Sequence, residues 1–166
     1  MVRTFYPFQC SNEKTVMYQL KRTQFVKASL EECWEFFSSP KNLQTITPPY
    51  MGFNIQTEVP EKMYEGLMIA YKVTPLLKIP MSWVTEIKYV HDKKFFVDEQ
   101  RQGPYKMWHH EHHFKELEGG VEMTDIVSYS LPMGFLGRMV HPFLVKGKLE
   151  EIFEYRFKKV DELFND

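Results

Sequence analysis

The sequence predicts one α+β domain in which a strand, two short helices, six further strands and a long helix follow one another. Residues 51 to 131 alternate between apolar and polar with a period of two, which is typical of strands with one buried face. From Leu149 to Phe164 the apolar residues return to a period near 3.6, which indicates an amphipathic helix. The breaks between the alternating segments are short, so we expect neighbouring strands to be antiparallel.

The N-terminal third is expected to hold one strand and both short helices. Residues 16 to 26 alternate and are rich in β-prone side chains, which favours a first strand. The helix that follows begins at Ser29, whose hydroxyl can cap it while Glu32 reaches back in a capping box. A second short helix over residues 41 to 46 should end before Pro48 and Pro49, because proline disrupts a helix interior.

The six later strands are bounded by turn-rich breaks. These breaks lie near residues 60–66, 75–78, 91–93, 103–105 and 118–120. Pro142 should start or kink the main body of the long helix, leaving residues 135 to 141 as a separate turn or a lid with glycine hinges. We expect residues 1–15 to be an N-terminal extension and residues 16–166 to form the single domain.

Composition excludes several classes of protein. The chain has 166 residues, 43% hydrophobic and 26% charged, with a net charge of −1, so it lacks the broad basic surface of a general nucleic-acid binder. It has two cysteines, Cys10 and Cys33, too few for a disulfide framework. Without a secretory signal or an apolar run of about 18 residues, we expect a cytoplasmic protein with no integral membrane span.

The segment 103–114, GPYKMWHHEHHF, contains four of the six histidines. In a strand, alternate side chains point to opposite faces. We expect the face bracketed by two aromatic residues to point inward; it carries Trp108, His110, His112 and Phe114. The other face carries Met107, His109, Glu111 and His113. The inward set therefore predicts a cavity wall with a polar centre.

Hairpin geometry suggests partners for the inward histidines. A turn at Gly119 and Gly120 would pair Glu118 with Val121, and continuing outward gives four further pairs. They are Phe114 with Asp125, His112 with Val127, His110 with Tyr129, and Trp108 with Leu131. Because both inward faces then coincide, a slip of one residue is disfavoured.

The preceding strand supplies the other neighbours. A turn near Pro104 and Tyr105 would bring three residues to this wall, with Arg101 near Trp108, Glu99 near His110 and Val97 near His112. A bulge beside the turn would exchange Glu99 and Arg101 for Asp98 and Gln100. In the first register, Glu99, Asp125 and Tyr129 surround the two histidines, and such buried groups should be mutually hydrogen-bonded.

Four strings carry a resemblance to a known family. They are KNLQTITPP at 41–49, W-x-T-x-I at 83–87, FFVDEQRQGPYKMWHHEHHF at 95–114 and D-x-V-x-Y-x-LP-x-G at 125–134. These strings resemble the START/polyketide-cyclase superfamily, also called SRPBCC, and within it a bacterial ligand-binding branch sometimes named cell-division inhibitors. The resemblance begins near Tyr18. It implies a helix-grip fold, in which a curved antiparallel sheet of about seven strands wraps the C-terminal helix and leaves a deep cavity. Relatives bind lipids, sterols, polyketides, quinones or plant hormones, and some are cyclases or dehydratases.

The polar cluster has three open interpretations. It can be a structural network, the polar end of a ligand cavity, or a reactive site in which His110 or His112 is a general base while Tyr129 or Arg101 stabilises an enolate. Two histidines with Glu99 or Asp125 would also suit a metal ion. Because a second metal-binding motif is missing, we expect no metal and no other cofactor.

We predict a protein that binds a small hydrophobic or amphipathic, lipid-, polyketide- or quinone-like ligand and is not an enzyme. A cyclase- or dehydratase-like enzyme, a regulatory protein-interaction module and a homodimer remain open. The predicted ligand-binding residues are Tyr71, Trp83, Val97, Glu99, Arg101, Trp108, His110, His112, Phe114, Asp125, Tyr129, Met139 and Phe143. The catalytic candidates are His110, His112 and Tyr129.

Overall fold

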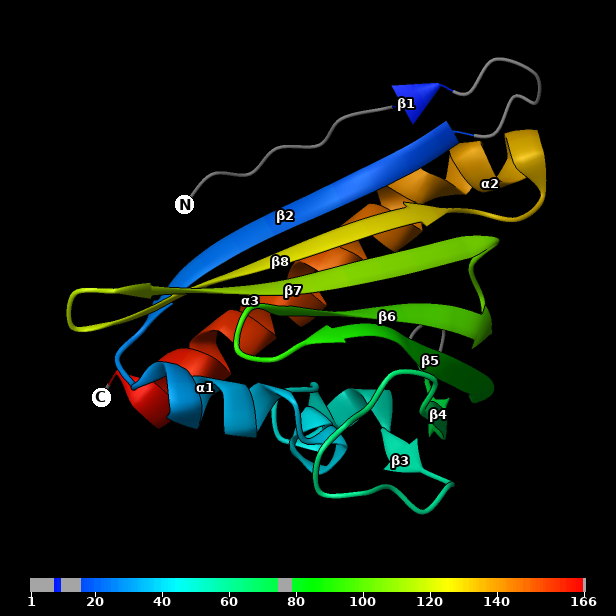
Figure 1. Ribbon diagram of the computed structural model, residues 1–166. Helices are drawn as coiled ribbons and strands as arrows, with labels where there is room; N and C mark the ends of the chain where they lie inside the picture. Colours follow the sequence, from blue (N-terminus) through cyan, green and yellow to red (C-terminus); the bar gives the residue numbers. More distant parts are fainter. Residues whose placement is uncertain (1–7, 10–15, 75–78, 166) are drawn as a thin grey trace.

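The computed structural model describes residues 8–9, 16–74 and 79–165. Within these residues one antiparallel sheet has the strand order β1-β2-β8-β7-β6-β5-β4-β3, and the long helix α3 crosses one face of it (Figure 1). The strands are β1 Phe8–Gln9, β2 Val16–Val26, β3 Asn54–Ile55, β4 Met68–Val73, β5 Met81–His91, β6 Phe95–Gln102, β7 Met107–Leu117 and β8 Gly120–Ser130. The predicted α+β architecture is confirmed. The short β1 lies within the predicted extension; most of that extension, like the predicted turn at 75–78, lies outside the described residues.

Helix α1, Leu30–Phe37, begins at the predicted capping box. The Ser29 hydroxyl accepts a hydrogen bond from the Glu32 backbone amide at 3.2 Å, and the Glu32 carboxylate accepts one from the Ser29 amide at 2.8 Å. Its buried face carries Cys33, Trp34 and Phe37. Instead of the helix expected over 41–46, the chain forms two short 3₁₀ helices, η1 Pro40–Gln44 and η2 Pro49–Met51.

The C-terminal segment has three parts. Helix α2, Gly134–Val140, leads into a π-helical turn, His141–Val145, which contains Pro142 and precedes α3, Lys146–Phe164. Proline here therefore marks a junction between helices, as predicted. Helix α3 buries Leu149, Phe153 and Val160. No helix among the described residues is long and apolar enough to cross a membrane.

The β7–β8 hairpin has the predicted inward faces but a different register. Leu117 pairs with Gly120, so the turn residues are Glu118 and Gly119, and Gly119 has φ +79°. Consequently His112 pairs with Asp125, His110 with Val127 and Trp108 with Tyr129. The predicted pairs were wrong by two residues. A shift of two residues keeps every side chain on its face, so alternation could not reveal it.

The β6–β7 pair also differs from the preferred prediction. Asp98 pairs with His110 and Glu99 with His109, which is the alternative register. The Gln100 side chain folds under the loop, where its amide nitrogen donates to the Tyr105 carbonyl at 2.7 Å and its oxygen accepts from the Tyr105 amide at 3.2 Å. This one-residue difference exchanges the two faces of β6, so Asp98 rather than Glu99 points inward.

Candidate functional site: an aromatic cavity with a histidine–aspartate wall

A cavity lies between the sheet, the η1–η2 segment and α3. The centre of a water-sized sphere can move through ≈ 170 Å³ of it. This is more than ten times the roughly 10–15 Å³ that one water molecule needs. Its aromatic lining residues are Phe36, Phe37, Phe53, Tyr71, Trp83, Phe96, Tyr105, Trp108 and Phe153. The cavity is thus large enough for more than trapped water, and most of its wall is apolar.

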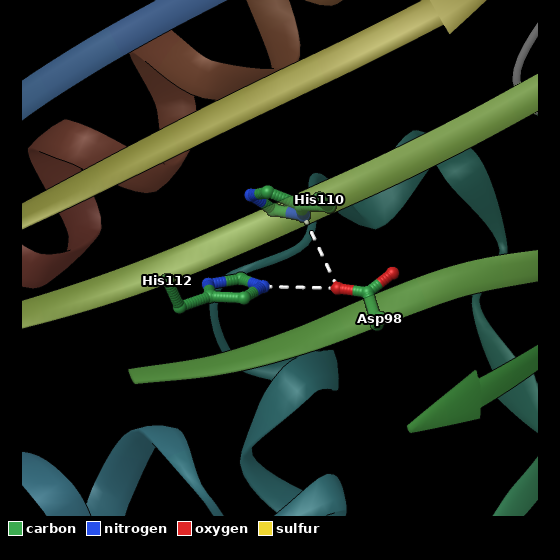
Figure 2. Close-up of side chains that lie close together, drawn as sticks. All are labelled: Asp98, His110 and His112. Atoms are coloured by element: carbon green, nitrogen blue, oxygen red, sulfur yellow. Dashed lines mark hydrogen bonds and ion pairs between the residues drawn. The ribbon is translucent and has the colours of Figure 1, made fainter. Parts of the chain in front are cut away.

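One part of the wall is polar. Asp98 from β6 and His110 and His112 from β7 line the cavity and point toward one another (Figure 2). Asp98 Oδ2 lies 2.9 Å from His112 Nε2 and 3.3 Å from His110 Nδ1. We call these three residues together with Asp125 the His–Asp cluster. Strand alternation brings His110 and His112 to one face, and cross-strand pairing places Asp98 beside them.

Asp125 of β8 lies against the opposite ring nitrogens of both histidines. Its Oδ1 is 3.2 Å from His110 Nε2 and 2.8 Å from His112 Nδ1. The first contact is a hydrogen bond, whereas the second does not have hydrogen-bond geometry. Arg156 of α3 places its Nη1 atom 3.6 Å from the same oxygen. Each imidazole therefore has one nitrogen at Asp98 and the other at Asp125.

Electrostatics favours the ionised form of both carboxyl groups. Burial alone would raise the pKa of Asp98, but the charge and hydrogen bonds of His110 and His112 hold it below its ordinary value. Burial also opposes ionisation of Asp125, yet Arg156 and the two histidines hold its pKa well below the usual range. Burial disfavours the charged form of His110, whereas Asp98 and Asp125 together raise its pKa. The wall therefore carries compensated charges beside an apolar space.

Aromatic contacts fix the histidine rings. His112 stacks on Phe96 with ring centroids 4.1 Å apart, and the two imidazole centroids are 3.8 Å apart. Phe153 of α3 meets His110 edge-on at 5.6 Å. Nearby, the Thr85 hydroxyl accepts a hydrogen bond from Trp83 Nε1 at 3.1 Å. Packing on several sides leaves these polar groups little rotational freedom.

Five of the predicted ligand-binding residues line the cavity. They are Tyr71, Trp83, Trp108, His110 and His112. Asp125 lies behind the histidines, as described above. The proposed positions of Glu99 and Arg101 were wrong: Glu99 contacts His109 on the opposite face at 2.9 Å, and Arg101 forms an ion pair with Glu86. Val97 shares that outer face, where it pairs with Glu111.

Three further predicted residues, Phe114, Tyr129 and Met139, lie away from the cavity wall. Phe114 packs edge-on against Trp34 beneath α1, with ring centroids 5.5 Å apart. Tyr129 is fully buried opposite Trp108, and its hydroxyl lies 2.8 Å from His141 Nε2, so the predicted contact with His110 was wrong. Met139 is 55% exposed on α2. The Phe143 side chain lies outside the description.

Two polar residues of the site, Asp98 and Arg156, are not among the predicted ligand-binding residues. Asp98 points inward only in the alternative register of β6, and the irregular loop after β6 prevents a choice between the two registers from the sequence. Arg156 carries a visible signal, since it is a charged residue on the apolar stripe that includes Leu149 and Phe153. A cation at a core-facing helical position predicts a buried anion opposite it, which is Asp125.

No family model matches this sequence, and no curated protein is similar to it. Solved structures are similar in fold. Protein Ms6760 from Mycobacterium smegmatis has a TM-score of 0.61 at 18% identity, covering 87% of this chain and 89% of that one. For ginseng major latex-like protein 151 from Panax ginseng the TM-score is 0.62 at 12% identity, covering 89% of this chain and 97% of that one. For truncated norcoclaurine synthase from Thalictrum flavum the TM-score is 0.63 at 16% identity, covering 91% of this chain and 98% of that one. With a long antiparallel sheet, a long C-terminal helix and a cavity between them, the chain shares the helix-grip fold of these solved structures.

Proposed function

We propose that this protein binds a small hydrophobic or amphipathic molecule, of a lipid-, polyketide- or quinone-like kind, in the cavity between the sheet and α3. The observation that carries the proposal is the cavity itself, ≈ 170 Å³ of space lined mainly by aromatic and aliphatic side chains with one polar wall. Binding sites for small molecules commonly combine such an apolar lining with a few fixed polar groups.

The polar wall gives the occupant an orientation. His110 and His112 face the cavity, and their contacts with Asp98 and Asp125 hold them in place. A carbonyl or hydroxyl oxygen of the occupant would meet these histidines, while Trp83 and Trp108 contact its apolar part. A comparison supports this use of the fold, since a point mutant of norcoclaurine synthase is known in complex with a transition-state analogue.

Native mass spectrometry of protein purified from cells tests the proposal directly. We expect a retained small molecule that dissociates on denaturation. With stripped protein, 1-anilinonaphthalene-8-sulfonate should bind and gain fluorescence while the near-ultraviolet circular dichroism stays that of the folded chain. Protein that carries no such mass and does not bind the dye would contradict the proposal.

A matched pair of variants on α3 locates the binding. Ile152 lines the cavity, so Ile152→Trp should fill part of it and weaken dye binding by at least about tenfold, or about 1.4 kcal/mol. Leu163 is 44% exposed on the same helix, so Leu163→Trp adds the same ring without entering the cavity. Equal dye binding by the two variants would place the dye elsewhere.

A catalytic role is the second candidate, because His110 faces the cavity and is held between two carboxylates. Its raised pKa suits a proton donor better than the general base expected from the sequence. In the dehydration of a β-hydroxy ketone, the Asp98 carboxylate would take the α proton, the C=C bond would form as the C–O bond breaks, and His110 would give its proton to the hydroxyl group, which departs as water. If so, His110→Gln should abolish turnover of a β-hydroxy ketone while the dye still binds; an unchanged rate would remove this candidate.

A further inference from the structure

We propose that Asp98, His110 and His112 bind a divalent first-row transition-metal ion at the polar wall of the cavity. The three residues offer Asp98 Oδ2, His110 Nδ1 and His112 Nε2 from two adjacent strands, and one ligand atom from each lies within 4.8 Å of the others. Figure 2 shows the three side chains converging from β6 and β7. His110 and His112 are buried and Asp98 is half-buried, so the cluster is unlike an exposed group of acidic residues.

The spacing suits direct coordination. Ligand atoms placed about 2.1 Å from an ion are about 3.0 Å apart in octahedral geometry and about 3.4 Å apart in tetrahedral geometry. The two nitrogen–oxygen distances, 2.9 and 3.3 Å, lie close to these values. Because the His110 and His112 backbones belong to one strand that pairs with β6, the sheet holds the ligands at this spacing without an ion.

Asp125 provides the second argument. Histidine ligands in metal sites usually give their other ring nitrogen to a carboxylate, which fixes the ring and makes the ligating nitrogen more basic. Here one oxygen of Asp125 forms a hydrogen bond of 3.2 Å with His110 Nε2, and it lies 2.8 Å from His112 Nδ1 without hydrogen-bond geometry. Arg156 lies 3.6 Å from that oxygen and offsets its charge.

The ligand set indicates the class of ion. Two imidazoles and one carboxylate suit iron, cobalt, nickel or zinc better than magnesium or calcium, which prefer oxygen ligands throughout. Three protein ligands leave coordination positions open. Since all three residues line the cavity, these positions face the space proposed for the ligand, whose oxygen atom could complete the coordination.

Cobalt titration of untagged, chelator-treated protein tests the inference. We expect one Co²⁺ per chain by isothermal titration calorimetry, with visible absorption of the bound ion and competition by Zn²⁺. His110→Gln and His112→Gln should each weaken Co²⁺ binding by at least a hundredfold. Asp125→Asn should weaken it by about ten- to a hundredfold, although Asp125 is not a ligand.

The outward histidines of the same strand are matched controls. His109 contacts Glu99, and His113 contacts Glu111 at 2.9 Å on the opposite face. His109→Gln and His113→Gln should leave Co²⁺ binding unchanged. Loss of binding in these variants, with retention in His110→Gln, would overturn the proposal and place the ion on the surface.

Loss of binding in a variant counts only if that variant is folded. Circular dichroism identifies variants that do not fold, and Asp98→Asn is the most conservative variant because it replaces one ligand with a side chain of the same shape. In wild-type protein alone, Co²⁺ should raise the Tm, and the absence of stoichiometric binding there would overturn the proposal whatever the variants do. Dye binding by the metal-free protein tests the proposed ligand cavity separately.

Discussion

Arg156 brings a positive charge from α3 to the His–Asp cluster. Its Nη1 atom lies 3.6 Å from Asp125 Oδ1, and both side chains are nearly buried, 12% and 10% exposed. Removal of one partner of a buried pair leaves the other charge uncompensated. We therefore expect Arg156→Met to lower the free energy of unfolding by about 2–4 kcal/mol, measured by urea denaturation at neutral pH.

A lysine two positions further on provides the control for Arg156. Lys158 is 70% exposed and reaches Glu154 only at 4.0 Å. Because exposed pairs contribute little, Lys158→Met should change the unfolding free energy by less than about 0.5 kcal/mol. Similar values for both variants would show that the Arg156–Asp125 contact does not stabilise the fold.

His141 makes stability depend on pH. The ring is buried, stacks on Tyr18 with ring centroids 3.5 Å apart, and shares a hydrogen bond of 2.8 Å between its Nε2 and the Tyr129 hydroxyl. Burial, with a smaller effect of Lys146, lowers its pKa to about 4 from an ordinary 6.5. Between these values the unfolded chain binds a proton that the folded chain does not, so stability falls as pH decreases from 6.5 toward 4.

The His141 contribution can be isolated by difference. The lowered pKa of His141 corresponds to a loss of at most about 3 kcal/mol in the free energy of unfolding. His141→Gln keeps a hydrogen-bond acceptor for Tyr129 but cannot titrate, so urea denaturation from pH 7 to pH 4 should show a smaller loss than in wild type. Asp98 and Asp125, whose pKa values are lowered, affect both proteins alike and lose their contribution only at lower pH. Parallel pH profiles would contradict the assignment to His141.

At the level of elements, the β7–β8 hairpin depends on two glycines for different reasons. Gly119 adopts φ +79° with open space around it, whereas a Cβ atom at Gly120 would lie 2.4 Å from the Val26 carbonyl oxygen of β2. Gly119→Ala should therefore cost about 1 kcal/mol for its backbone conformation. Gly120→Ala should lower the free energy of unfolding by more, about 2–3 kcal/mol, because β2 must move away from β8.

Thermal denaturation of the two glycine variants measures this order. Hydrogen exchange should also rise in β2 of Gly120→Ala, near Val26, and stay unchanged there in Gly119→Ala. The opposite order of stability would show that the turn lies at Gly119 and Gly120, as first predicted from the sequence.

The alternation of apolar and polar residues predicted the strands and their inward faces, but not which residues pair across neighbouring strands. The inward face of β7 is buried at Trp108, His110, His112 and Phe114 as expected. Register depends on turn geometry: turns at 118–119 and at 119–120 are one position apart, but the strand pairings that they give differ by two residues, so each face stays intact. For β6 the error came from Gln100, whose bonds to Tyr105 shape a loop that no periodic pattern describes.

For the molecule as a whole, the order of elements was predictable because each signal is local. The capping box at Ser29 and the stripe on α3 need no information from distant residues. The site joins the consecutive strands β6, β7 and β8 to α3, which is distant in sequence. Local patterns could therefore place Asp125 beside His110 and His112, but they could not decide which register of β6 brings Asp98 there, nor show that Arg156 contacts Asp125.

The cavity separates parts of the apolar core that a bound molecule would connect. One core cluster contains Trp83, Trp108 and Phe153, another contains Phe37 and Phe96, and residues of both line the cavity. An occupant that binds only the folded chain stabilises it by about 2.7 kcal/mol when its concentration is 100 times the Kd. For a domain of this size, this corresponds to a rise in Tm of about 5–10 °C.

We expect 1-anilinonaphthalene-8-sulfonate at that concentration to produce this rise in wild-type protein, measured by the loss of far-ultraviolet circular dichroism on heating. Leu163→Trp, which leaves the cavity free, should show the same rise. Ile152→Trp should show little or none, because its indole occupies space that the dye needs. A rise of equal size in Ile152→Trp would mean that the dye stabilises the fold from another surface, and the sheet and α3 would then enclose a space without a role in binding.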